Sequence, residues 1–251
     1  MSEPLVTVVT ATTGNPFLYD ALLSVKKQTY TNIEHYVVID GNERKKDALK
    51  IVSKFPDVKV LTLPYATGRD NYNGHRIYAA ATYLTNGRYI SFLDEDNYYD
   101  PTHIQDCVDV VHDNYDWGYS LRKIVDKDKN YICNDDCESL GKHRSVLNDN
   151  FIDVGCWFLS KACALMVSPL WFRRARNPKE QPEVDRIITS TLIQHSPKFE
   201  GTGKYTFNYR VGSRADSVQA EFFLRGNKLI YEALGEDLPW RKKEETITIN
   251  I

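Results

Sequence analysis

Residues 89–101, YISFLDEDNYYDP, join a hydrophobic run to three consecutive acidic side chains. Tyr89 to Leu93 has the composition of a buried strand, and Asp94, Glu95 and Asp96 follow at its carboxyl end. Like charges in a row repel one another, so we expect a group of opposite charge beside them. The remaining sequence indicates which fold carries this stretch and what that group is.

Strand and helix patterns alternate through the first hundred residues. The predicted strands are 5–11, 34–40, 58–63 and 88–93, and the predicted helices lie within 13–28, 43–55 and 73–85. In the third helix the spacing places Ile77, Ala80, Ala81 and Leu84 on one buried face. The alternation predicts an α/β fold, in which a Rossmann-like, mostly parallel sheet has helices on both faces.

The second half of the chain has a less regular pattern. It predicts a helix after Pro101, a hairpin over 119–133, a helix near 183–195, a strand over 205–211 and a helix from about Ser217. We therefore expect a smaller, mixed region to follow the parallel sheet.

Composition excludes several classes of protein. The chain has 251 residues, and its 32 basic against 34 acidic side chains leave a net charge of −2, which predicts no attraction to nucleic acid. No apolar run approaches 18 residues, so we expect no membrane span. The N-terminus lacks a signal-peptide pattern and the five cysteines are an odd number, which together favour reduced thiols in a cytoplasmic protein. Cys133 and Cys137 with His143 lack a fourth zinc ligand, so ordinary thiols are the better interpretation.

In a parallel sheet, ligands bind beyond the carboxyl ends of the strands. Thr10 to Thr12, Asp40, Gly68-Arg69 and Asp94 to Asp96 all lie at such ends. The chain has neither G-x-G-x-x-G after its first strand nor a P-loop, so phosphates must be bound in another way. Asp94 and Asp96 can converge on one side while Glu95 points away, and two carboxylates suit Mg²⁺ or Mn²⁺. The cation would offset the repulsion within the acidic triplet.

These residues resemble the inverting family 2 glycosyltransferases, which have the GT-A fold. The match rests on three blocks: VTVVTAT (6–12), LLSVKKQTYTNIEHYVVIDG (22–41) and GRYISFLDEDNYYDP (87–101). One departure is that the second strand ends in a single Asp followed by Gly, where many members carry two adjacent Asp. The resemblance implies a single GT-A domain over 1–251. Its half 1–101 would bind the nucleotide sugar, and its half 102–251, with the C-terminal tail, would bind the acceptor.

The resemblance also implies a role for each strand-end residue. Thr10, Ala11 and Thr12 are similar to the loop whose backbone meets the nucleobase. Asp40 is similar to the carboxylate that accepts the ring N–H of the base, which favours uracil, although a turn residue in Asp-Gly is the alternative. Arg69 resembles the basic residue that faces base or phosphate, with a solvated arginine as the alternative. Asp94 would touch the ribose or the metal, Asp96 would hold the metal, and Glu95 would belong to the nucleotide-sugar site.

A general base must remove the proton of the attacking hydroxyl, and a carboxylate is the usual choice. Asp185 begins a predicted helix where the family usually keeps its base; the alternative for Asp185 is a carboxylate favoured by the helix dipole. Asp153 and Glu183 are the other candidates. Trp157 could stack on a sugar, but a buried core residue is the better interpretation.

The function implied is transfer of a sugar from a nucleoside-diphosphate sugar, UDP-sugar favoured, to a hydroxyl of a glycan or other acceptor. Mn²⁺ or Mg²⁺ would assist this reaction. A non-catalytic nucleotide-sugar-binding module is the main alternative. A sugar-nucleotide pyrophosphorylase should open with a Gly-rich loop containing Arg, and TATTGNPF (10–17) offers one Gly and no basic residue.

Overall fold

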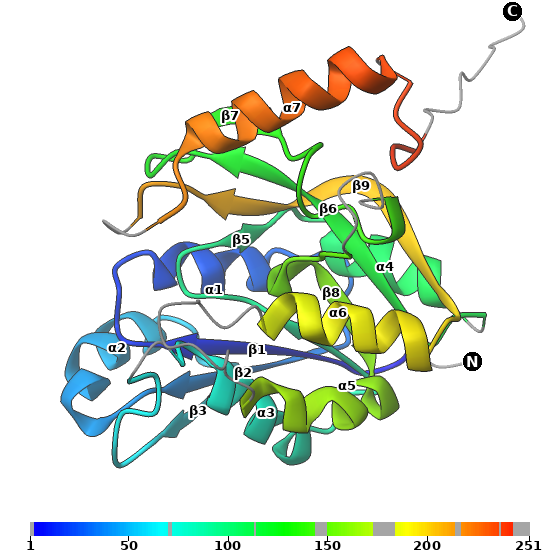
Figure 1. Cartoon of the computed structure of the whole chain (residues 1–251). Coiled ribbons are helices and arrows are strands. Elements are labelled where there is room, and N and C mark those ends of the chain that lie inside the picture. The colour runs from blue at the N-terminus through cyan, green and yellow to red at the C-terminus, as the bar shows by residue number, and fades with distance from the viewer. Residues whose placement is uncertain are drawn as a thin grey trace, which may run out of the picture.

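A computed structural model describes residues 3–69, 72–112, 114–143, 150–172, 184–213, 217–235 and 237–242. These residues form one sheet flanked by helices (Figure 1). The strands are β1 (Val6–Thr12), β2 (Ile33–Ile39), β3 (Lys59–Thr62), β4 (Tyr89–Phe92), β5 (Tyr98–Tyr99), β6 (Trp117–Val125), β7 (Tyr131–Asn134), β8 (Trp157–Ser160) and β9 (Phe199–Arg210). The α-helices are α1 (Leu18–Lys26), α2 (Lys45–Val52), α3 (His75–Leu84), α4 (His103–Val111), α5 (Lys161–Val167), α6 (Val184–His195) and α7 (Ala220–Leu234). The 3₁₀ helices that lie wholly within the described residues include η1 (Asn42–Arg44), η3 (Val154–Cys156) and η4 (Ser168–Phe172).

The first half confirms the predicted α/β fold. Strands β1 to β4 are parallel and lie in the order β3-β2-β1-β4, each crossover being made by a helix. The β-branched residues of β1 and β2 are buried except for the partly buried Ile33, whereas β3 is the outermost strand and is largely exposed. Because the four strands share one direction, the residues after each of them lie along one edge of the sheet.

The second half extends the same sheet. The predicted hairpin is present as β6 and β7, which pair antiparallel. Strand β8 lies between β4 and β6 and is antiparallel to both, and β9 is parallel to β6. Strands β4, β6 and β9 therefore run in the same direction and end at the same edge of the sheet. The sequence patterns did not predict β8 or the helix α5 that follows it.

The predicted buried face of α3 is only partly correct. Ile77 and Ala81 are buried, but Ala80 is exposed and Leu84 is 57% exposed. Tyr78 is buried instead, because η4 covers a second side of α3 and the ring of Trp171 packs against Tyr78. Burial on two sides changes which positions of a helix face the core.

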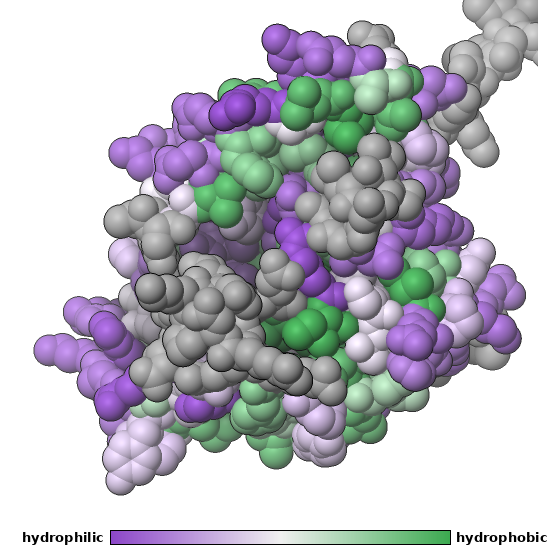
Figure 2. Space-filling model, in the orientation of Figure 1, coloured by the Kyte–Doolittle hydropathy of each residue, from purple (hydrophilic) through white to green (hydrophobic). Residues whose placement is uncertain are grey.

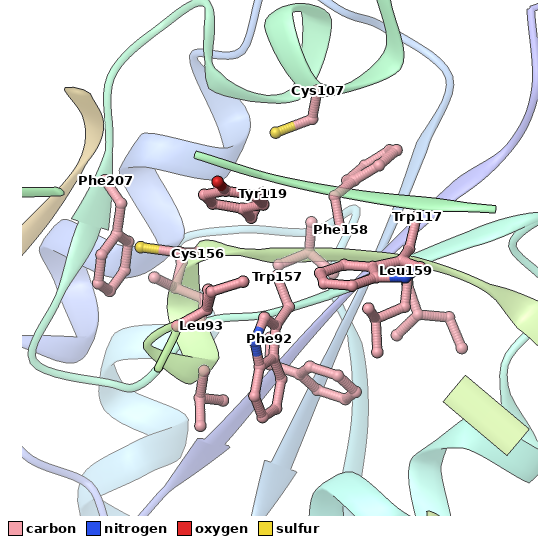
Figure 3. Packing of buried hydrophobic residues seen from close by; sticks show 14 of the residues in the cluster. Phe92, Leu93, Cys107, Trp117, Tyr119, Cys156, Trp157, Phe158, Leu159 and Phe207 are labelled. Atoms are coloured by element: carbon pink, nitrogen blue, oxygen red, sulfur yellow. The ribbon is translucent and has the colours of Figure 1, made fainter. Parts of the chain in front are cut away.

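The core continues from the first half into the second without a break. Trp157 is fully buried, which confirms the interpretation as a core residue. Figure 3 shows Trp157 on the same face of the sheet as Phe92, with Phe158 on the opposite face. The five cysteines are free thiols. Across the described ranges, no helix is both long and apolar enough to cross a membrane.

Candidate active site

The acidic triplet forms a turn directly after β4. The N–H of Asn97 donates to the carbonyl of Asp94 at 3.2 Å, which closes the turn. The hydroxyl of Tyr78 donates to Asp94 at 2.5 Å, and the hydroxyl of Ser213 donates to Asp96 at 2.9 Å. Both partners are distant in sequence, and no local pattern indicated either of them. Each contact orients one carboxylate of the D-x-D pair, which consists of Asp94 and Asp96.

Glu95 is 3% exposed and contacts other partners than Asp94 and Asp96 do. Its carboxylate accepts four hydrogen bonds, from the hydroxyl of Thr12 (2.5 Å), the N–H and hydroxyl of Thr13 (3.1 and 2.7 Å) and the N–H of Asn15 (3.1 Å). Glu95 therefore holds the loop that follows β1.

Asp40 follows β2 and is 6% exposed. Its Oδ1 accepts from the N–H and the hydroxyl of Thr67 (2.6 and 2.8 Å), and its Oδ2 accepts from the N–H of Gly68 (2.9 Å). A Cβ on Gly68 would lie 2.6 Å from the carbonyl oxygen of Asn73, so this close approach requires glycine. Asp40 thus fixes the loop after β3 next to the end of β2.

Arg69 lies in that loop and is exposed. A second basic residue, Arg76, packs on the ring of Tyr72 at 3.8 Å and donates to the carbonyl of Thr67 at 3.1 Å. Sequence patterns did not single out Arg76, because its contacts depend on how the loop folds back over α3. The two arginines bring positive charge to the edge where Asp40 lies.

The three residues at the end of β1 have separate surroundings. The hydroxyl of Thr10 lies 3.0 Å from Nε2 of His35 inside the sheet. Ala11 is partly buried and lies next to Gly74, where an added Cβ would approach it to 3.0 Å. The carbonyl of Thr12 accepts from the N–H of Asp40 at 2.9 Å, so the ends of β1 and β2 are joined directly.

Asp185 lies in the first turn of α6 and is partly buried. Burial, the largest cause, and the negative charges of Asp153 and Asp94 together raise its pKa to about 8, while Arg122 and Arg186 act in the opposite sense. The charge of Asp94 acts on Asp185 although the two lie 91 positions apart in the sequence, so the fold brings them into one electrostatic neighbourhood. Glu183, the third candidate base, lies outside the described residues.

Asp153 is held by a buried ion pair. Nη1 of Arg122 donates to its Oδ2 at 2.5 Å, and the N–H of Gly155 donates to its Oδ1 at 2.9 Å. Nε of Arg122 donates to Asp135 at 2.6 Å, and Arg122 itself is 4% exposed. Burial acts to lower the pKa of the Arg122 guanidinium, but Asp135 and Asp153 raise it overall, so Arg122 keeps its charge. The carboxylate of Asp153 is consequently engaged, whereas Asp185 is the carboxyl whose pKa is most clearly raised by its surroundings.

Acidic groups dominate this edge of the sheet. Burial raises the pKa of Tyr209, Arg122 lowers it, and the charges of Asp153, Asp96 and Asp94 raise it, so the field of all three carboxylates acts on one side chain. Among the described residues no three His, Cys, Asp or Glu side chains form a complete metal site. Asp94 and Asp96 nonetheless fit a cation that takes its other ligands from a bound phosphate, because each supplies an oriented carboxylate. In Figure 2, hydrophilic side chains run across the middle of this face of the molecule.

The sequence of this chain matches one family over more than half its length. Residues 7–170 match the family described as Glycosyl transferase family 2, and this range includes Asp40, Asp94 and Asp96. The chain belongs to this glycosyltransferase family. No curated protein matches the chain.

Solved structures with the same fold are distant in sequence from this family 2 member. TarS 1–349 from S. aureus in complex with UDP has a TM-score of 0.62 at 18% identity, and the match covers 93% of this chain and 67% of that one. The TarS complex with UDP-GlcNAc has a TM-score of 0.61 at 18% identity, and the match covers 93% of this chain and 68% of that one. The mannosyltransferase PcManGT from Pyrobaculum calidifontis, in complex with GDP-Man and Mn²⁺, has a TM-score of 0.55 at 12% identity. The match covers 86% of this chain and 59% of that one.

These similarities confirm the predicted GT-A fold. The chain spans only 40% of the longer TarS structure. Family and fold together establish a glycosyltransferase-type domain.

Proposed function

We propose that this protein is an inverting, metal-assisted glycosyltransferase that moves a sugar from a UDP-sugar to a hydroxyl of a glycan or other acceptor. The observation that carries the proposal is the electrostatic neighbourhood that Asp94, at the end of β4, shares with Asp185, at the start of α6. In this proposal Asp94 serves the leaving diphosphate and Asp185 serves the attacking hydroxyl. Five free thiols agree with action in a reducing compartment such as the cytoplasm.

The donor half supplies binding and orientation. Asp94 and Asp96 would hold a divalent cation, Mn²⁺ or Mg²⁺, which supplies Lewis-acid stabilisation of charge on the leaving diphosphate. Tyr78 and Ser213 hold these two carboxylates in place through their hydrogen bonds. Glu95 and Asp40 shape the loops after β1 and β3, between which we place the nucleoside.

Asp185 is the proposed general base. Inversion requires the acceptor hydroxyl to attack the anomeric carbon from the side opposite the diphosphate, so the base must come from a different segment than the D-x-D turn. Asp185 meets this requirement because it lies in α6, a different segment of the chain from the turn after β4. Asp153 is less suited to the role, because its two oxygens already accept hydrogen bonds from Arg122 and Gly155.

UDP is the favoured nucleotide for two reasons. TarS, which has this fold and is 18% identical to this chain, has been solved in complex with UDP and with UDP-GlcNAc. In addition, a single carboxylate at Asp40 supplies one hydrogen-bond acceptor for the ring N–H of uracil. PcManGT binds GDP-Man with Mn²⁺, so GDP is the competitor to be measured beside UDP.

Calorimetric titration of UDP, GDP and dTDP, each with Mn²⁺ and with EDTA, tests this function. We expect UDP to bind best and Mn²⁺ to strengthen binding. Asp96→Asn should abolish the metal effect and leave the melting temperature nearly unchanged, because this strand-end side chain supports no core packing. Equal UDP affinity with Mn²⁺ and with EDTA would contradict metal assistance. Release of UDP from a UDP-sugar distinguishes an enzyme from a binding module, which leaves the donor intact.

A further inference from the structure

An aromatic cluster beside Asp94 carries three hydrogen-bonding atoms to which the described residues offer no partner. They are Nε1 of Trp157, Nε1 of Trp171 and Nδ1 of His75. Both tryptophans are 0% exposed, so water at the protein surface does not reach these atoms either. Buried polar groups are almost always hydrogen-bonded in folded proteins, so three exceptions in one cluster require an explanation.

Trp171 is the centre of this cluster. Its ring centroid lies 5.5 Å from that of His75, 5.8 Å from that of Trp157 and 5.4 Å from that of Tyr78. Tyr78 in turn donates its hydroxyl to Asp94. The three unpartnered atoms are thus linked by direct packing to the D-x-D turn.

The cluster also lies at the carboxyl edge of the parallel strands, where ligands are expected to bind. His75 is the first residue of α3, whose N-terminus is at the carboxyl edge of the strands because α3 leads back into β4. Trp171 is in η4, which packs against both α3 and α6. Asp185 is in the first turn of α6. Through Tyr78 and η4, the cluster therefore packs against the segments that carry Asp94 and Asp185.

The available atoms define the chemistry of a ligand. An indole N–H only donates a hydrogen bond. His75 is neutral near pH 7, because burial lowers its pKa to about 4, so its Nδ1 donates or accepts according to tautomer. The site thus matches an uncharged group with one acceptor oxygen and one donor. The carboxylates of Asp94 and Asp96 disfavour an acidic sugar at this place.

We propose that Trp157, Trp171 and His75 form the subsite for the acetamido group of an N-acetylated donor sugar. The carbonyl oxygen would accept from the indole N–H groups, the amide N–H would donate to the imidazole, and the methyl group would pack against the aromatic rings. An acetamido group extends further from the sugar ring than a hydroxyl does. It therefore suits hydrogen-bonding N–H groups that are buried as deeply as these. This inference rests on the proposed function, because it places the sugar of a nucleotide donor next to Asp94.

The test compares UDP-N-acetylglucosamine and UDP-N-acetylgalactosamine with UDP-glucose and UDP-galactose by calorimetry in Mn²⁺. We expect the wild-type protein to bind the better N-acetylated donor about tenfold or more tightly than its parent sugar, which corresponds to about one hydrogen bond. Trp171→Phe and His75→Phe should each bring this ratio close to one. Neither substitution should change the affinity for UDP by more than about twofold, since UDP carries no sugar.

Trp117→Phe is the matched control. Trp117 is also fully buried, but its Nε1 donates to the carbonyl of Ser196 at 2.8 Å, away from the cluster. The ratio should survive in this variant. A wild-type ratio near one overturns the inference while leaving the proposed function intact, provided that UDP binds. A ratio that survives Trp171→Phe and His75→Phe, or that falls equally in Trp117→Phe, also overturns it and assigns the three atoms to buried water. Failure to bind UDP at all overturns the inference together with the proposed function.

Discussion

The hydroxyl of Tyr78 donates a 2.5 Å hydrogen bond to Oδ1 of Asp94 and so joins the first turns of α3 to the end of β4. The ring of Tyr78 packs against Phe92, which precedes the acidic triplet, and against Trp171. Burial and the charge of Asp94 raise the pKa of Tyr78 well above its ordinary value, so it remains a donor at any physiological pH. One side chain therefore links the aromatic core to the carboxylate proposed to hold the metal.

Tyr78→Phe should weaken metal-dependent donor binding. The substitution keeps the ring in place and removes only the hydroxyl that orients Asp94, so we expect a loss of about 1 kcal/mol, or about fivefold in affinity. Calorimetry of UDP with Mn²⁺ measures the loss, and binding in EDTA should stay unchanged. Tyr83→Phe is the control, because it removes a hydrogen bond to Ser168 from the same helix at a distance from Asp94. Equal losses in the two variants would contradict the role of Tyr78.

Asp40→Ala should weaken UDP binding with and without metal. The substitution removes the acceptor of hydrogen bonds from Thr67 and Gly68 and, in the proposed function, the acceptor for uracil. We expect a loss of about 1–3 kcal/mol, the range for a hydrogen bond to a charged group. Titrations in Mn²⁺ and in EDTA should show the same loss. A loss seen only with Mn²⁺ would place Asp40 away from the base. Asp47→Ala, an exposed change in α2, is the control.

Glu95→Gln should destabilise the fold more than an exposed Glu→Gln change. An amide NH₂ would face N–H and O–H donors from Thr12, Thr13 and Asn15, so at least one buried donor loses its acceptor. We expect the free energy of unfolding to fall by about 1–3 kcal/mol. Urea denaturation measures it, with exposed Glu221→Gln as the reference, expected within about 0.5 kcal/mol of wild type. A wild-type midpoint for Glu95→Gln would show that the loop after β1 is held in another way.

Asp185→Asn should separate catalysis from binding. If Asp185 is the base, UDP and Mn²⁺ binding stay near wild type while sugar transfer falls by about 10²–10⁴-fold. Asp153→Asn should instead lower stability, because it leaves the buried charge of Arg122 with one fewer partner. Transfer is measured per folded molecule with a UDP-release assay. Full activity of Asp185→Asn beside an inactive but folded Asp153→Asn would exchange the two roles.

The raised pKa of Asp185 predicts a pH-dependent cost in stability. Its pKa is about 8 in the folded chain and about 3.9 in an unfolded one, so between these values the folded state binds more protons. Stability contributed by this group is therefore lost as pH rises from about 4 to about 8. Asp185→Asn removes the loss, and its stability advantage over wild type should be larger at pH 8 than at pH 5 in urea denaturation. The same advantage at both values would mean that Asp185 titrates normally.

The sequence by itself determined the parallel half of the sheet and the position of the D-x-D turn. Hydrophobic periodicity is a local property, and a strand end is recognised from the residues on either side of it. Once four parallel strands were predicted, Asp40 and Asp94 had to lie along one edge, because parallel strands end together. The pattern over 119–133 indicated the β6–β7 hairpin because a hairpin is also encoded by residues close together in the sequence.

Only the tertiary structure decided what each carboxylate contacts. Tyr78 is 16 residues from Asp94 and Ser213 is 117 residues from Asp96, and no pattern within a single helix or strand encodes such pairings. The buried face of α3 turned toward Tyr78 because η4 covers the helix, and η4 lies more than eighty residues further along the chain. The raised pKa of Asp185 likewise depends on burial and on charges from β4 and η3. Burial and electrostatics arise from the whole packed chain, so they exist only once the segments have come together.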